Sequence, residues 1–61
     1  MKIEIMKSDV GGEKEIIQLS NDLIPEIWGL ISFSGNYEML IIEPRDKTEY
    51  RKAIKIVDKY I

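Results

Sequence analysis

The 61-residue sequence contains neither cysteine nor histidine. Without cysteine the chain can form no disulfide and no thiolate metal site. Without histidine it lacks the commonest transition-metal ligand and the usual acid–base group near neutral pH, so a Ser-His-Asp device is impossible. We therefore predict no enzyme activity and no cofactor, with no catalytic, cofactor-binding or metal-ligating residues.

Long apolar runs are missing as well. No stretch approaches the length that spans a bilayer, and residues 1–5 lack the apolar segment of a signal peptide. These absences predict a cytoplasmic protein without membrane contact. Glutamine occurs once, whereas isoleucine occurs twelve times and lysine and glutamate are abundant, a composition typical of thermophilic proteins.

The chain has room for one domain, residues 1–61, and no more. Its hydrophobic residues (44%) and charged residues (33%) are balanced as in soluble globular proteins. Small domains usually gain extra stability from disulfides, metals or association. Because cysteine and histidine are absent, tight packing or association with another chain remains as the source of this extra stability.

The N-terminal third of the sequence predicts a hairpin. Residues 2–6 alternate between polar and apolar, with Ile3 and Ile5 on one side, as in a half-buried strand. Residues 8–12 end in two glycines and are typical of a turn. Residues 15–19 are predicted to form a second strand that pairs with the first.

Residues 20–33 allow two predictions. The favoured one is a turn over residues 20–26 followed by a strand over residues 27–33, because this second stretch is rich in β-branched and aromatic residues. The alternative is a short helix near residues 22–31, where apolar residues recur with helical spacing. This helix would cover the second face of the sheet and would compete with any contact made there.

The most informative segment, residues 37–43, is apolar on both faces of a strand. Alternate side chains point to opposite sides, so Tyr37, Met39 and Ile41 share one face. Leu40 lies on the other face. Such a strand needs cover on both sides. Because one helix covers a single face of a small sheet, a loop, a second layer or another chain must close the other face.

The C-terminal helix is predicted from its cap and from its apolar stripe. Pro44 ends the preceding strand, and Asp46 followed by Glu49 three residues later has the pattern of a capping box. The stripe consists of apolar residues at helical spacing: Tyr50, Ala53, Ile54, Val57, Tyr60 and Ile61. The predicted order is ββββα, an α+β fold in which a small antiparallel β-sheet packs against one C-terminal amphipathic helix. The alternative with the short helix is ββαβα.

Charge is distributed unevenly along the chain. Residues 1–43 carry a formal charge of −5, and residues 44–61 carry +3. Arg51, Lys55 and Lys59 repeat every four residues and form what we call the basic ridge. The ridge is typical of a solvated helix face, but it also allows an alternative function, weak nucleic-acid binding. The net charge of −2 disfavours that alternative, since such binding depends on a large positive footprint.

The predicted function is a protein-interaction or assembly module without catalytic chemistry of its own. The candidate interface is the second sheet face, which a partner protein or a second copy in a homodimer would cover. Its residues are Trp28, Tyr37, Met39 and Ile41. The default role of Trp28 is a core anchor, and an interface contact is the alternative. No small-molecule substrate is indicated, and nucleic acid is the less favoured partner.

Overall fold

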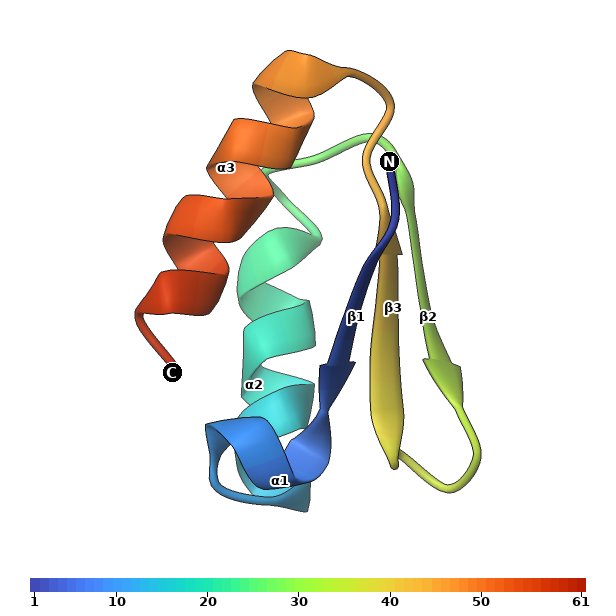
Figure 1. Ribbon diagram of the computed structural model, residues 1–61, viewed down its shortest axis with the longest axis vertical. Coiled ribbons are helices and arrows are strands. Elements are labelled where there is room, and N and C mark those ends of the chain that lie inside the picture. Colours follow the sequence, from blue (N-terminus) through green and yellow to red (C-terminus); the bar gives the residue numbers. More distant parts are fainter.

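The computed structural model describes residues 1–61 as two layers, a three-stranded antiparallel sheet with helices packed on it (Figure 1). In chain order the elements are β1 (Ile3–Met6), α1 (Lys7–Val10), α2 (Glu13–Leu23), β2 (Leu30–Ser34), β3 (Met39–Glu43) and α3 (Lys47–Asp58). The predicted α+β class and antiparallel sheet are confirmed. The predicted number and order of elements are wrong, because there are three strands instead of four and a helix stands where the second strand was expected. None of the helices is long and apolar enough to cross a membrane.

β3 is the central strand and pairs antiparallel with both neighbours, in the order β1-β3-β2. The registers set Ile5 of β1 and Phe33 of β2 on either side of Leu40. β1 therefore pairs with a strand far along the chain. The predicted hairpin between residues 2–6 and residues 15–19 does not form, and the β2–β3 hairpin is the local pairing.

The predicted second strand is part of α2. Ile16, Leu19 and Leu23 are fully buried, and their spacing of three and four residues places them on one face of a helix. The helical spacing can be recognised only when Leu23 is included. Within residues 15–19 the adjacent Ile16 and Ile17 also fit the alternating pattern of a short strand. Gly11 and Gly12 adopt positive φ angles of 110° and 135°, which turn the chain from α1 into α2.

α2 ends at Leu23, so the alternative helix near residues 22–31 is wrong in its position. Pro25 follows closely and has no N–H to continue the helical hydrogen bonds. The N–H of Ile27 returns to the carbonyl of Leu23 at 3.2 Å and closes a turn. The predicted strand over residues 27–33 exists, but it begins three residues later, at the start of β2.

α3 confirms the predicted C-terminal helix and its cap. The Oδ1 atom of Asp46 accepts the N–H of Glu49 at 2.9 Å. Ala53 and Val57 are buried in the core, whereas Ile61 lies beyond the helix and exposes 72% of its surface. The buried stripe is therefore shorter than predicted. The core comprises ten residues: Ile5, Val10, Ile16, Leu19, Leu23, Ile27, Leu40, Ile42, Ala53 and Val57.

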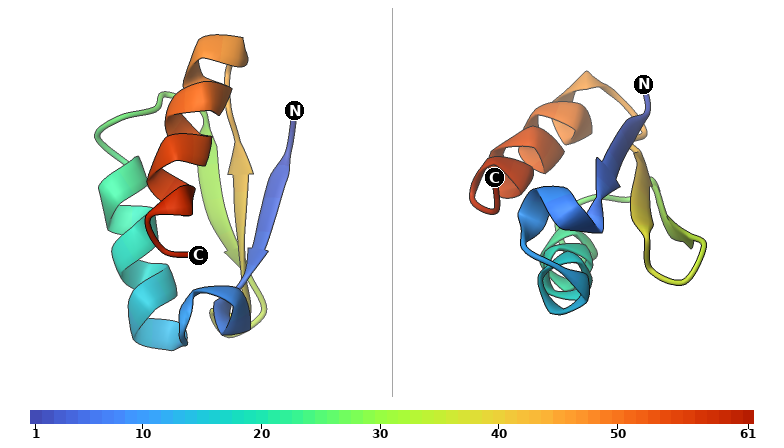
Figure 2. Two further views of the ribbon diagram at one scale, coloured as in Figure 1. Left: turned by 60° about the vertical axis from the view of Figure 1, so that its left-hand side comes forward. Right: turned by 60° about the horizontal axis from the view of Figure 1, so that its bottom comes forward.

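Both long helices, α2 and α3, cover the same face of the sheet (Figure 2). Leu40 and Ile42 of β3 are fully buried on that side. Met39 and Ile41 alternate with them and point to the opposite side. No helix lies on that side. Neither the predicted C-terminal helix nor the alternative helix near residues 22–31 covers it, and we call this side the open face. Its strand residues, fixed by the registers, are Glu4, Met6, Leu30, Ser32, Ser34, Met39, Ile41 and Glu43.

Candidate interaction surface

The open face has its apolar side chains along the central strand. Met39 and Ile41 are half-buried between their neighbours on the two edge strands. Met6 stands opposite Met39 and exposes 44% of its surface. Ser32 and Ser34 of β2 supply small polar neighbours on the other side. Two of the four predicted interface residues, Met39 and Ile41, thus lie together on uncovered sheet.

Tyr37 does not share this surface. β3 begins at Met39, and Tyr37 precedes it in the hairpin turn with a positive φ of 62°. Its ring packs edge-on against Phe33, with 4.9 Å between the ring centroids. Phe33 points toward the helices, because its register partner Leu40 is buried there. The strand alternation that predicted a common face for Tyr37, Met39 and Ile41 therefore breaks at the turn.

Trp28 is the most exposed large hydrophobic residue, with 83% of its surface accessible. The sequence predicted a core position for Trp28 by default, and this prediction is wrong. It lies just before β2, and Leu30 at the start of that strand exposes 70%. Because Leu30 pairs with Glu43 at the far end of β3, Trp28 and Tyr37 flank opposite ends of β2.

A buried carboxylate fixes the backbone at Trp28. Oε2 of Glu49 accepts the N–H of Trp28 at 2.5 Å, and Oε1 accepts the N–H groups of Gly29 at 3.1 Å and Arg45 at 2.8 Å. Burial works to raise the pKa of Glu49, but these three N–H groups and the charge of Arg45 outweigh it and hold the pKa below its ordinary value. The carboxylate is therefore occupied in joining the α2–β2 and β3–α3 connections.

Gly29 allows these two connections to touch. A Cβ atom at this position would lie 2.0 Å from the carbonyl oxygen of Glu43 and 2.9 Å from the Cα of Pro44. Any larger residue would push the segments apart. The sequence predicted the helix cap at Asp46 with Glu49 in the capping-box pattern. It did not predict the contact of the Glu49 carboxylate with the two connections, which we call the clamp, because Trp28 and Glu49 are 21 residues apart. The only signal was a glycine directly before a strand, which often marks a close backbone approach.

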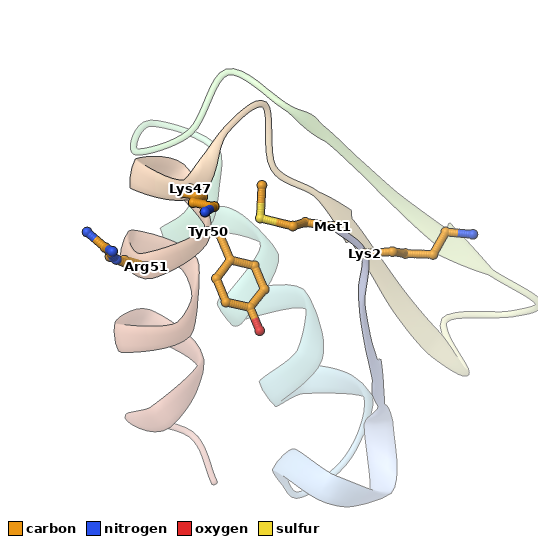
Figure 3. Close-up of a pocket in the computed structure, with 5 residues that line it drawn as sticks. All are labelled: Met1, Lys2, Lys47, Tyr50 and Arg51. Carbon is orange, nitrogen blue, oxygen red and sulfur yellow. The ribbon is translucent and has the colours of Figure 1, made fainter.

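The basic ridge lies on the outer side of α3, where Arg51, Lys55 and Lys59 are all exposed. A pocket of about 400 Å³ opens between the first turns of α3 and the start of β1 (Figure 3). It is lined by Met1, Lys2, Lys47, Tyr50 and Arg51. Figure 3 shows Lys2 and Arg51 pointing away from each other, so these cations border the pocket and do not converge on it.

No group of three or more acidic side chains comes close enough to hold a metal ion. Every buried side-chain polar atom has a hydrogen-bond partner. Comparisons with protein-family models, with characterised proteins and with solved structures gave no match. The function has to be inferred from the surface of this chain.

Proposed function

We propose that this protein is an interaction or assembly module, without catalytic chemistry of its own, that binds a partner protein through the open face. The observation that supports this most is the position of α2 and α3 on one side of the sheet, which leaves Met6, Met39 and Ile41 uncovered. A sheet with apolar residues on both faces is ordinarily packed on both. Contiguous exposed apolar surface on a small protein is a common feature of interaction sites and supports this proposal.

Trp28 adds an anchor at the edge of this surface. Exposed tryptophan is among the residues that most often dominate binding energy. Its backbone N–H is already fixed by Glu49, so binding has to order only the indole side chain. Leu30 lies on the open face two residues further along and extends the apolar surface from Trp28 to the strands.

The charges around the open face indicate the chemistry of the partner. Glu4 stands beside Ile41, and Glu43 stands beside Leu30 at the end of β3, so carboxylates border the apolar centre. A complementary partner has an apolar centre with lysine or arginine at its margin. A second copy in a face-to-face homodimer would repeat the same carboxylates, so a different protein fits this face better.

The size of the face indicates a weak, reversible contact. Three strands spaced by about 4.8 Å, each about 17 Å long, give a footprint of about 240 Å². A stable complex of standard size buries about 800 Å² on each partner. Trp28 enlarges the footprint, but the contact remains at the lower end of specific interfaces.

Photo-cross-linking tests this proposal. A photoreactive side chain would replace Ile41 in one variant and Lys52, on the exposed side of α3, in a matched control. Expressed in the cell of origin, the variant at position 41 is expected to give a discrete adduct with another protein that the control lacks. Adding Met39→Lys should abolish that adduct, because it places a charge in the centre of the apolar face.

Three outcomes would count against the proposal. The first is no adduct at position 41, and the second is the same adduct at position 52. The third is an adduct of twice the 7.1 kDa mass of the chain, which would identify a second copy on the open face.

The pocket beside α3 is the observation that favours the second candidate, weak nucleic-acid binding. Tyr50 offers an aromatic ring, and Lys2, Lys47 and Arg51 border it with positive charge. Base stacking with phosphate contacts at the margin is a common way to bind single strands. The net charge of −2 and the divergent directions of Lys2 and Arg51 leave this candidate in second place.

A further inference from the structure

The outer edge of β2 is an unpaired strand edge without the usual protection. β2 is five residues long and lies at one side of the sheet, with β3 on its inner side only (Figure 1). Its sequence, residues 30–34, contains no charged residue and no proline. Natural edge strands are usually kept apart by such residues, because free N–H and C=O groups pair readily with another strand.

The other edge of the sheet is better protected. β1 has only four residues, carries Glu4 in its middle, and runs directly into α1. An inward or central charge on an edge strand opposes pairing with a second strand. The contrast between the two edges makes β2 the one suited to association.

From this contrast we infer that β2 pairs antiparallel with β2 of a second copy of this chain, around a two-fold axis at Ser32. This goes beyond the proposed function, because it uses the edge of the sheet and not its open face. Ser32 is the middle residue of β2, so this register alone pairs all five residues of both strands. The pairs are Ser32 with the partner's Ser32, Leu30 with the partner's Ser34, and Ile31 with the partner's Phe33. The result is one sheet of six strands, three from each copy.

The side chains on the two faces of β2 suit this register. Ile31 and Phe33 are half-buried and pack against the core on the helix side. Pairing each with the other across the axis extends that core from one copy to the next. On the open face the axis brings only serine against serine, so no charge is buried.

The aromatic residues next to β2 lie outside the pairing. Within one chain Trp28 and Tyr37 flank opposite ends of β2. Residues 28 and 29 lie before β2 and residues 35–37 lie in the hairpin turn, so the strand register does not extend to them. The pairing is therefore made by the five residues of β2 alone.

The buried area predicts a reversible dimer. The paired edge is five residues, or about 17 Å, long, and it buries on the order of 300 Å² per copy. This is less than half of the roughly 800 Å² per partner in a standard stable complex. The pairing also joins two open faces into one surface of about twice the footprint, which a single partner can bridge.

Single-cysteine variants test the pairing without interference, because the chain has no cysteine of its own. Ser32→Cys places two thiols across the axis with Cβ atoms about 5 Å apart, within reach of a disulfide. In a thiol–disulfide buffer it is expected to form covalent dimers about tenfold faster than controls, because the dimer holds the thiols at a high effective concentration. Sedimentation of the wild type at millimolar concentration should show the dimer.

Two controls match Ser32→Cys. Ile41→Cys lies directly beside position 32 on the neighbouring strand, and in the dimer the two copies of position 41 are three strand spacings, or about 14 Å, apart. Lys52→Cys lies on the exposed side of α3. Neither should cross-link faster than random collision. Adding Met39→Lys should leave cross-linking at position 32 unchanged, which separates this inference from the open-face proposal.

The inference is overturned if Ser32→Cys oxidises no faster than Lys52→Cys. It is also overturned if the wild type sediments as a monomer at every concentration. The β2 edge would then pair with a strand of another protein or with no strand. Hydrogen exchange gives a third measurement. Outward-facing amides of β2 should become protected as concentration rises, and amides that exchange freely at all concentrations would contradict the pairing.

Discussion

Glu49 accepts hydrogen bonds from two segments that meet only in the folded chain. Its carboxylate oxygens take the N–H groups of Trp28 and Gly29 from one connection and that of Arg45 from the other. Its own N–H is bound by Asp46 at the start of α3. A single ionised side chain therefore holds the first turn of α3, the end of β3 and the approach to β2 in one arrangement.

Glu49→Gln tests this role through the pH dependence of stability. Since the pKa of Glu49 in the folded chain lies below its ordinary value of 4.5, ionised Glu49 stabilises the fold above that pH. The contribution is lost as the pH falls through the lower, folded-state pKa. The glutamine variant lacks it, because its amide keeps one acceptor oxygen and turns an NH₂ group toward an N–H donor.

Thermal melts by circular dichroism between pH 7 and pH 3 measure the effect. We expect the variant to melt several degrees lower at neutral pH, with a difference in melting temperature that narrows as the pH falls below 4.5. Glu26→Gln is the matched control, since Glu26 is exposed and its replacement should leave the melting temperature close to that of the wild type. A gap that stays constant across the range would mean that the charge of Glu49 has no part in the clamp.

At the scale of elements, α3 was predictable and α2 was not. α3 has a side-chain cap at Asp46 and a long apolar stripe, two local signals that agree with each other. α2 begins after Gly12 without a side-chain cap, and Ser20 in its interior reads as a strand breaker. The open face was predictable in part, because the strand alternation of residues 39–43 is a local signal. The clamp at Glu49 was not predictable, because it joins segments that are distant in the sequence.

The partner of β1 lay outside what local patterns reveal. The alternation of residues 2–6 gave a strand with the correct inward residues, Ile3 and Ile5. It carried no information on which strand would pair with it. Sequence neighbours usually pair, but here two helices and the strand β2 lie between β1 and β3 in the chain.

Val57→Asp tests the packing of α3 on the core. Val57 is buried with only 4% of its surface exposed, so an aspartate there would place a charge among apolar side chains. The expected cost is about 3 kcal/mol or more, comparable to the whole stability of a domain of this size. The variant should be unfolded or nearly so at 25 °C by circular dichroism.

Ile61→Asp is the control for this variant. Ile61 belongs to the same predicted apolar stripe, yet it exposes 72% of its surface beyond the end of α3. Its replacement is expected to leave the melting temperature close to that of the wild type. Equal melting temperatures for Val57→Asp and the wild type would show that α3 does not pack as described.

At the scale of the whole molecule, the basic ridge and the apolar open face are on different sides. The basic ridge lies on the outer side of α3, which packs on one face of the sheet. The apolar residues Met39 and Ile41 lie on the other face, bordered by carboxylates. Protein binding and nucleic-acid binding would therefore use separate surfaces and can be tested separately.

Titration with mixed DNA and RNA at low salt tests the basic ridge. We expect no binding at micromolar concentration, because the net charge of −2 opposes a polyanion and the ridge offers few phosphate contacts. The double variant Arg51→Glu/Lys55→Glu should then behave like the wild type. Micromolar binding that weakens steeply with salt and disappears in the double variant would make nucleic-acid binding the better proposal.

The position of the only tryptophan has a consequence for spectroscopy. Trp28 is already 83% exposed in the folded chain, so its emission should be close to that of a solvated indole before and after unfolding. A fluorescence melt would miss the transition that circular dichroism records. Any protein surface that covers the indole would shift its emission to shorter wavelength. The chain thus carries an intrinsic fluorophore that is silent about its folding and responds to its contacts with other molecules.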